Sequence, residues 1–364
     1  MNTLSTTQKE QPAETRAPKS ILTLTRACSE ACSFCAVDAY RISGNGGWPA
    51  QQHRAKGELL PEEWRAVAEK ILTAHPHAAF DLSGGDCLAL PWVGDSFIPF
   101  LMERVRDRNH VALTAPAASL GSWLERAKGH LPESLPGSVH ITYDGYRAYS
   151  FANIKLAPVA RAAGVDMHVE CPLTSDNCNT KDVKDIYLTA RESGIGEMLI
   201  MRFFPVGRAA KAISRCAELE PLPDMYRAAI AEFRRLESTY KDGPKIKVQC
   251  ALKKFDPCFD GSDPCKMGDQ TWCVMPDGTM LICPWAYGMG GNPLHDCFVA
   301  GNILTNSLGM LDAKAVALRA MHADNDPGEC RILSFLAAGD AASHLAALFP
   351  PSEASGPEPC RSVQ

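Results

Sequence analysis

Three cysteines in a short run carry the clearest chemical signal in this chain: Cys28, Cys32 and Cys35. They follow directly on an apolar segment, residues 21–25, that is expected to form a strand. A 4Fe–4S cube ordinarily takes four cysteine ligands, so three thiolates would hold it and leave one iron open for chemistry. Structural zinc needs a fourth ligand close by, and the neighbouring residues supply none. The run therefore predicts a cluster rather than a zinc site or buried structural thiols.

A second group of cysteines surrounds an expected hairpin, with strands at 270–275 and 279–284 and a turn at 276–278 whose Pro, Asp and Gly suit a tight reversal. Cys258 and Cys265 precede the hairpin, and Cys283 lies within it. With a fourth cysteine, a group of this kind around a hairpin is typical of a zinc ribbon as well as of an iron–sulfur site, so the spacing leaves both interpretations open.

The elements that must position these residues alternate along the chain. The expected strands are 21–25, 78–82, 110–114, 138–143, 166–171 and 197–204. The expected helices are 61–75, 120–128, 150–163, 181–193 and 223–240. Such alternation predicts an α/β fold with a parallel sheet, in which the loops after the strands build the site. Periodicity does not distinguish a barrel from an open doubly wound sheet.

Polar residues stand at the ends of three of these strands. The second strand ends in Ser83-Gly84-Gly85-Asp86, where glycines let a ligand approach the backbone, although a Gly-Gly pair is also a simple turn. Thr142 and Asp144 point to one side of the fourth strand end, and a polar strand cap is the alternative. Arg202 ends the sixth strand, where it would pair a carboxylate of a ligand or form a structural salt bridge.

The cysteine run, with Phe34 just before its last member, resembles the signature of radical S-adenosylmethionine (SAM) enzymes. Residues 83–86 resemble the family's GGE motif with Asp in place of Glu, and residues 142–145 and 205–209 resemble its S-x-D-G and P-x-G-R-A endings. The resemblance implies a partial (β/α)6 TIM-like barrel over residues 20–240, with the SAM-cleaving 4Fe–4S cluster on the cysteine run. The residues it places around SAM are Phe34, Ser83, Gly84, Gly85, Asp86, Thr142, Asp144 and Arg202.

The spacing Cys265-x12-Gly278-x4-Cys283 is similar to the opening of a SPASM/twitch domain. That resemblance implies a small hairpin and helical iron–sulfur domain over residues 241–348, between disordered ends at 1–19 and 349–364. It implies one auxiliary 4Fe–4S cluster on Cys258, Cys265, Cys283 and Cys330, with Cys273 and Cys297 as rival fourth ligands. If none of the three reaches the cluster, its open iron would bind substrate.

The activity implied is reductive cleavage of SAM to a 5'-deoxyadenosyl radical that abstracts hydrogen from a substrate. The auxiliary cluster would accept the second electron, giving net oxidation or oxidative bond formation in natural-product or peptide maturation. Flavodoxin or ferredoxin would supply electrons. Epimerisation is the alternative reaction, with Cys171 or Cys178 returning the hydrogen atom. A non-catalytic iron–sulfur electron carrier or a zinc-stabilised binding protein is the alternative from another class.

The substrate class stays open between a peptide and a small molecule. Only about 20 residues precede the first strand, too few for an additional peptide-binding domain. We therefore expect either a small molecule, such as an aminocyclitol or sugar, or a peptide presented by a separate carrier protein.

The composition of the chain limits its possible partners and its cellular location. The 364 residues have a formal net charge of -5 and no long Lys/Arg run, which argues against nucleic acid as the main partner. No apolar run reaches the length of about 18 residues that spans a membrane, and the polar N-terminus lacks a secretory signal. We expect a cytoplasmic protein, in which 15 cysteines indicate metal or catalytic roles rather than disulfides.

Overall fold

The computed structural model describes residues 18–30, 32–42, 57–130, 132–211, 218–269, 271–322 and 328–338. Of the disorder predicted at 1–19 and 349–364, residues 1–17 and 349–364 lie outside these ranges, as does any helix beyond residue 338, whereas Lys19 is the first residue of a strand. Among the described residues, no helix combines the length and the apolar character needed to cross a membrane.

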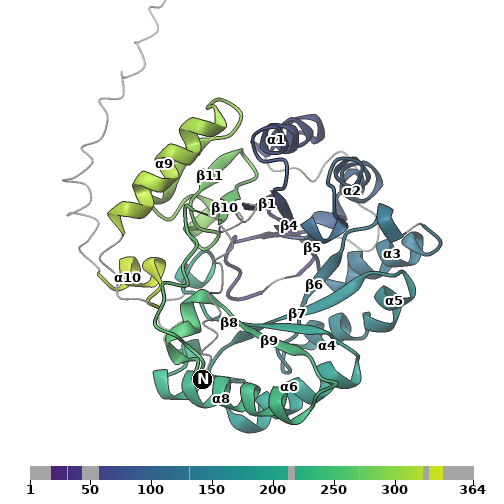
Figure 1. Ribbon diagram of the computed structural model, residues 1–364, viewed down its shortest axis with the longest axis vertical. Coiled ribbons are helices and arrows are strands. Elements are labelled where there is room, and N and C mark those ends of the chain that lie inside the picture. The colour runs from purple at the N-terminus through teal and green to yellow at the C-terminus, as the bar shows by residue number, and fades with distance from the viewer. Residues whose placement is uncertain are drawn as a thin grey trace, which may run out of the picture.

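One curved sheet of ten strands forms the centre, in the order β12-β11-β10-β1-β4-β5-β6-β7-β8-β9, and helices surround it (Figure 1). The first six predicted strands are β1 (Lys19–Thr25), β4 (Ala79–Gly84), β5 (Val111–Thr114), β6 (Ser138–Thr142), β7 (Asp166–Leu173) and β8 (Glu197–Arg202). All six are parallel to their neighbours, which confirms the predicted α/β partial barrel.

Side chains alternate across these strands, so the two faces of the sheet differ in polarity. On β7, Met167, Val169 and Cys171 are buried, whereas His168 and Glu170 point to the other face and stay partly exposed. β6 repeats the pattern. The apolar face packs against the helices, and the opposite face gives the barrel a polar interior.

The helices follow the predicted positions closely. They are α1 (Pro61–Ala74), α2 (Ile98–Met102), α3 (Ala117–Ala127), α4 (Ala148–Ile154), α5 (Ala157–Ala162), α6 (Thr180–Glu192), α8 (Pro223–Thr239), α9 (Leu308–Met321) and α10 (Arg331–Ala337). In α1 a proline at the first position starts the helix, and Trp64, Val67 and Ile71 bury its inner face.

Two segments differ from the expectation. The helix predicted over 150–163 is two short helices, α4 and α5, because Pro158 has no N–H to continue the hydrogen bonding of a helix and fits only its first turn. The sequence analysis also missed η2 (Val93–Phe97) and α2, which fill the connection between β4 and β5.

The segment after residue 240 joins the same sheet at both edges. β9 (Lys245–Val248) pairs with β8, and β10 (Thr271–Val274) runs parallel to β1 with Ile21 opposite Cys273. The predicted hairpin is β10 and β11 (Thr279–Leu281), and β12 (Val299–Asn302) extends it. The domain boundary at 240 stays a prediction, but sheet pairing crosses it twice.

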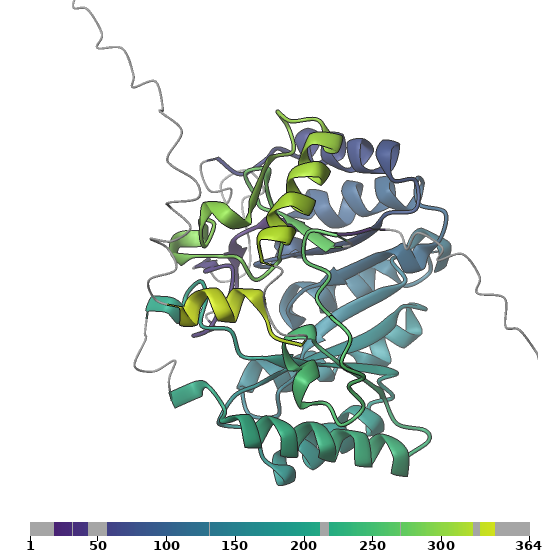
Figure 2. The same cartoon turned by 60° about the vertical axis from the view of Figure 1, so that its left-hand side comes forward.

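The helical tail packs back on the start of the barrel. α9 lies against β12 and near α1, as the turned view shows (Figure 2). Lys70 on α1 donates to the carbonyl oxygens of Ile303 and Asn306 at 2.6 and 2.5 Å, and His75 contacts Asp312 at 3.1 Å. The C-terminal segment is therefore held on α1, the first helix of the barrel.

Candidate functional site

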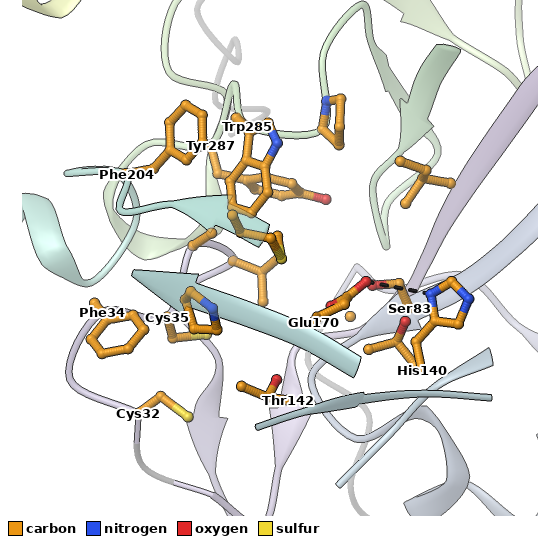
Figure 3. A pocket seen from close by; sticks show the side chains of 18 of the residues that line it. Cys32, Phe34, Cys35, Ser83, His140, Thr142, Glu170, Phe204, Trp285 and Tyr287 are labelled. Atoms are coloured by element: carbon orange, nitrogen blue, oxygen red, sulfur yellow. Dashed lines mark ion pairs between the residues drawn. The ribbon is translucent and has the colours of Figure 1, made fainter. Parts of the chain in front are cut away.

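A cavity of about 370 Å³ lies inside the barrel, on its polar face (Figure 3). A smaller one of about 140 Å³ shares part of its wall, including Cys32, Cys35, Gly84 and Thr142. Of the residues predicted to surround SAM, those that line the larger cavity are Phe34, Ser83, Gly84, Thr142 and Arg202. Gly85 lines the smaller one.

The cysteine run lies at the junction of the two cavities. Cys28 belongs to the short strand β2 (Ala27–Cys28), and Cys28, Cys32 and Cys35 all line the smaller cavity. Within the described ranges, no three His, Cys, Asp or Glu side chains converge closely enough to hold a single metal ion. Three soft donors around one small space nevertheless fit the shared face of an iron–sulfur cluster.

Burial disfavours the charged form of these thiols. It raises the pKa of Cys28 to about 12 and also raises the pKa of Cys35. Only the thiolate is a metal ligand, and the positive charge of bound iron opposes this effect. Arg208 supplies further positive charge, and it holds the loop through hydrogen bonds from its backbone N–H to Cys35 O at 3.0 Å and from Nη1 to Cys32 O at 2.7 Å.

Gly84 and Gly85 let the end of β4 pass directly beside the segment that leads to Cys28. A Cβ on Gly84, whose φ is +130°, would lie 2.4 Å from the carbonyl oxygen of Thr25. A Cβ on Gly85 would lie 2.1 Å from that of Ala27. Glycine is required here because no side chain fits between two backbones at this distance.

Two carboxylates predicted to position SAM line neither cavity. Asp86 is buried, and it accepts hydrogen bonds from Ser119 Oγ at 2.5 Å, Ser29 Oγ at 3.3 Å and the N–H of Ala89 at 3.2 Å. Burial raises its pKa. Asp86 thus caps the short helix η1 (Cys87–Ala89) and supports the cysteine loop from behind.

Asp144 is fully buried and is occupied by its own turn. Its Oδ1 accepts the N–H groups of Tyr146 and Arg147, at 3.3 and 3.1 Å, and its Oδ2 pairs with Arg147 Nε. The structure therefore makes Asp144 a positioning residue for Arg147.

Arg147 is a site residue that the sequence analysis missed. It lines the larger cavity, and its guanidinium carbon lies 4.3 Å from the ring centre of Phe34 and 4.7 Å from that of Tyr149. Its buried Nη2 has no hydrogen-bond partner among the described residues. A fixed guanidinium at the wall of a cavity, with one nitrogen unpaired, suits a carboxylate. The available signal was the i, i+3 spacing from Asp144.

Arg202 makes the salt bridge that was its structural alternative. Its Nη2 lies 2.8 Å from Glu220 Oε1, while the side chain still lines the cavity and its Nε has no partner among the described residues. Tyr226 also donates to Glu220, at 3.4 Å. The pair fixes the guanidinium at the wall of the cavity and leaves one N–H for a ligand.

The C-terminal cysteines group differently from the predicted ligand set. Electrostatic interactions link the thiols of Cys250, Cys265, Cys283 and Cys330 with one another, so these four lie together. Cys258 is exposed. Sequence reasoning passed over Cys250 because no motif surrounds it; it starts the helix η6 (Cys250–Phe255) just after β9.

Four further cysteines are buried outside this group of four thiols. They are Cys273 and Cys297, the alternative fourth ligands, and Cys171 and Cys178, the predicted hydrogen donors. Cys273 lines the larger cavity, and Cys297 lies beside Asp296. Cys171 is on the helix-facing side of β7, and Cys178 follows that strand; neither lines either cavity. Burial raises the pKa of both thiols, that of Cys178 to about 12.

Comparisons with known proteins bear on the fold. No family model matches the sequence, and no curated protein sequence matches it. The solved structure of anSMEcpe with bound AdoMet, which is SAM, has a TM-score of 0.56 at 16% identity, over 83% of this chain and 79% of that one. SuiB of Streptococcus suis bound to S-adenosylmethionine has a TM-score of 0.57 at 13% identity, over 83% of this chain and 66% of that one.

The chain shares the fold of these two SAM-bound structures. A further structure, anSMEcpe with bound AdoMet and Cp18Cys peptide, has a TM-score of 0.56 at 15% identity, over 83% of this chain and 82% of that one. At these identities the likeness concerns the fold, and the chemistry of the site rests on the residues described above.

The close passage at Gly85 yields a stability prediction. Gly85→Ala should lower the free energy of unfolding by about 1–3 kcal/mol, because the added Cβ forces two backbone segments apart. Urea unfolding of the iron-free protein, followed by circular dichroism, measures it. Gly309→Ala is the matched control, since a Cβ there meets no atom within 4 Å and alanine favours the helix α9. Equal stability of Gly85→Ala and the wild type would contradict the close approach of the Gly85 and Ala27 backbones.

Proposed function

We propose that this protein is a radical SAM enzyme that cleaves SAM reductively and uses the 5'-deoxyadenosyl radical to take hydrogen from a substrate. The observation that carries the proposal is that Cys28, Cys32 and Cys35 all line one small cavity, which shares part of its wall with the larger cavity of the barrel. The fold, shared with structures that contain bound SAM, supports it.

Different side chains around the two cavities would bind the cluster and SAM. Cys28, Cys32 and Cys35 would ligate the 4Fe–4S cluster, which supplies the electron for cleavage. Phe34, Ser83, Gly84, Gly85, Thr142 and Arg202 would contact SAM, while Asp86 and Asp144 act behind them as positioning residues. Arg147 would bind the SAM carboxylate through its free N–H.

A second 4Fe–4S cluster is proposed on the C-terminal cysteines, for electron transfer during turnover. Cys250, Cys265, Cys283 and Cys330 are its ligands in this proposal, because their thiols lie together while Cys258 is exposed. An external one-electron donor of the flavodoxin or ferredoxin type would reduce the clusters. Hydrogen abstraction then leads either to net oxidation of the substrate, with the second cluster as electron acceptor, or to inversion of a carbon centre, with a thiol as hydrogen donor.

The cavity favours a substrate that is polar on one side and flat or apolar on the other. Asp81, His140 and Glu170 line it, and so do Phe204 and Trp285, which stack with ring centres 4.4 Å apart. SuiB has been solved bound to the precursor peptide SuiA, and anSMEcpe with the Cp18Cys peptide. We propose a peptide side chain or a small polar molecule as the substrate of this protein.

Cleavage of SAM is the direct test. Protein reconstituted anaerobically with iron and sulfide should form 5'-deoxyadenosine and methionine from SAM when dithionite is added, as measured by liquid chromatography. Cys32→Ala should abolish the product, because the cluster loses one of three ligands. Cys87→Ala, which removes a buried thiol outside both cavity linings, should retain it. Absence of 5'-deoxyadenosine from the wild type would refute the proposal.

The assignment of Arg147 predicts a defect in SAM binding. Arg147→Ala should raise the KM for SAM about 10- to 100-fold, since hydrogen bonds to charged groups contribute about 1.5–3 kcal/mol. Arg147→Lys should have a KM between those of the wild type and Arg147→Ala, because lysine keeps the positive charge but lacks the planar guanidinium that can make two parallel hydrogen bonds. Arg126→Ala, on an exposed part of α3, is the control. An unchanged KM in Arg147→Ala would remove this residue from the SAM site.

The ligand set of the second cluster predicts different iron contents for two cysteine variants. Cys250→Ala should lose about four iron ions per chain relative to the wild type, because it removes one of the grouped thiols. Cys258→Ala should keep them, because that cysteine is exposed and outside the group. Iron and sulfide analysis after anaerobic reconstitution measures the cluster content of both variants. Loss of iron in Cys258→Ala but not in Cys250→Ala would show that Cys258 is the ligand instead.

A further inference from the structure

Cys273 is a cavity thiol that belongs to neither cysteine group. It lies on β10, opposite Ile21 of β1, and it lines the 370 Å³ cavity together with Cys32 and Cys35. Its position results from the parallel pairing of β10 with β1, which brings a residue 250 positions away next to Thr23.

Burial keeps the hydrogen of Cys273 on the sulfur, because it raises the pKa of this thiol to about 11. Its Sγ lies 3.4 Å from Thr23 Oγ1 and 3.4 Å from the hydroxyl of Tyr287, and both residues also line the cavity. The Tyr287 hydroxyl donates its single hydrogen to Thr23 Oγ1 at 2.7 Å. In the contact with Tyr287 the thiol must therefore be the donor. Both partners are neutral hydroxyls, which do not favour a thiolate as a cation would.

The cavity around Cys273 is built to receive a polar occupant. Asp81 is 7% exposed and pairs with Lys19 through Oδ2, at 2.8 Å, but its buried Oδ1 has no hydrogen-bond partner within the described residues. The same holds for Arg147 Nη2. Unpaired buried polar atoms on a cavity wall are costly unless a ligand or water satisfies them.

The walls of the cavity carry different chemistry. In Figure 3, Cys32, Phe34 and Thr142 lie on one side, and Tyr287 and Trp285 lie on another. Cys273 is hydrogen-bonded to Tyr287, so its thiol belongs to that second wall. A substrate between them would lose hydrogen toward the SAM side and meet the thiol on its opposite face.

We infer that Cys273 donates a hydrogen atom to the substrate radical, so that the reaction inverts a carbon centre instead of oxidising it. This inference rests on the proposed function and names its reaction. The S–H bond of Cys273 breaks as the new C–H bond forms on the substrate carbon. The resulting thiyl radical takes one electron from a reduced iron–sulfur cluster or the external donor and one proton from solvent, which restores the thiol. The substrate is neither oxidised nor reduced overall.

Deuterium transfer tests the donor without knowledge of the substrate. Reconstituted wild-type protein in D2O, with SAM, titanium(III) citrate and no added thiol, should form 5'-deoxyadenosine that contains deuterium, measured by mass spectrometry. The Cys273 S–D bond is weak enough to quench a primary carbon radical, whereas O–D bonds are not. Cys273→Ser keeps a hydrogen-bonding group of similar size, and should lose the deuterium while still forming 5'-deoxyadenosine. Cys87→Ala should keep it.

The outcomes separate the two proposals. Lack of 5'-deoxyadenosine in every variant would refute the proposed function, and the inference with it. Formation of 5'-deoxyadenosine with equal deuterium content in the wild type and Cys273→Ser would overturn the inference alone. Loss of iron in Cys273→Ser would also overturn it, because Cys273 would then be a cluster ligand.

A second measurement uses the iron-free protein, so it does not depend on turnover. The infrared S–H stretch falls in a region with little other protein absorption. The difference between wild type and Cys273→Ser should contain one hydrogen-bonded S–H band, and that band should shift when 5'-deoxyadenosine is added. The band removed by Cys87→Ala should not shift. A missing or unresponsive Cys273 band would contradict a protonated thiol within reach of the nucleoside.

Discussion

The site depends on one close contact between two stretches of backbone. The end of β4 passes the carbonyl oxygens of Thr25 and Ala27 so closely that only glycine fits at positions 84 and 85. The N–H of Gly85 donates to Thr25 O at 2.8 Å, and that of Asp86 donates to Ala27 O at 2.6 Å. This contact fixes Cys28 at the mouth of the barrel. The loop that follows is held from the other side by Arg208, so the cysteine run lies between the ends of β4 and β8.

The alternation of side chains on the strands explains which groups reach the cavity. On β7, Glu170 and Pro172 point inward, whereas Cys171 points to the helices, and the period of two allows no other choice. A thiol on that face is a small apolar residue of the core. Asp81 on β4, His140 on β6 and Glu170 on β7 reach the cavity by the same rule, and these polar side chains distinguish this interior from an apolar barrel core.

Much of the fold and part of the site could be predicted from the sequence because those features are local. Strand and helix periodicity, the cysteine run and the Gly-Gly pair each involve only neighbouring residues. The roles of Asp86 and Asp144 could not be predicted, since an aspartate after a strand serves equally as a ligand contact or as a turn and helix cap. Cys250 was missed because its importance arises from distant cysteines, which spacing along the chain does not reveal. Arg147 was missed because a spacing of three from Asp144 does not show that the side chain lies at a cavity beside Phe34.

The pairing of β10 with β1 makes the C-terminal segment part of the reaction chamber. Without it, the edge of β1 would expose unpaired backbone groups directly before the cysteine run. With it, Cys273 and Tyr287 complete a wall that the six-stranded core alone does not provide. The electrostatic group of Cys250, Cys265, Cys283 and Cys330 belongs to the same segment, and Arg202, which lines the cavity, also interacts with Cys330. One chain segment therefore supplies both the far wall of the cavity and the second set of sulfurs, which places any electron carrier held there close to the substrate.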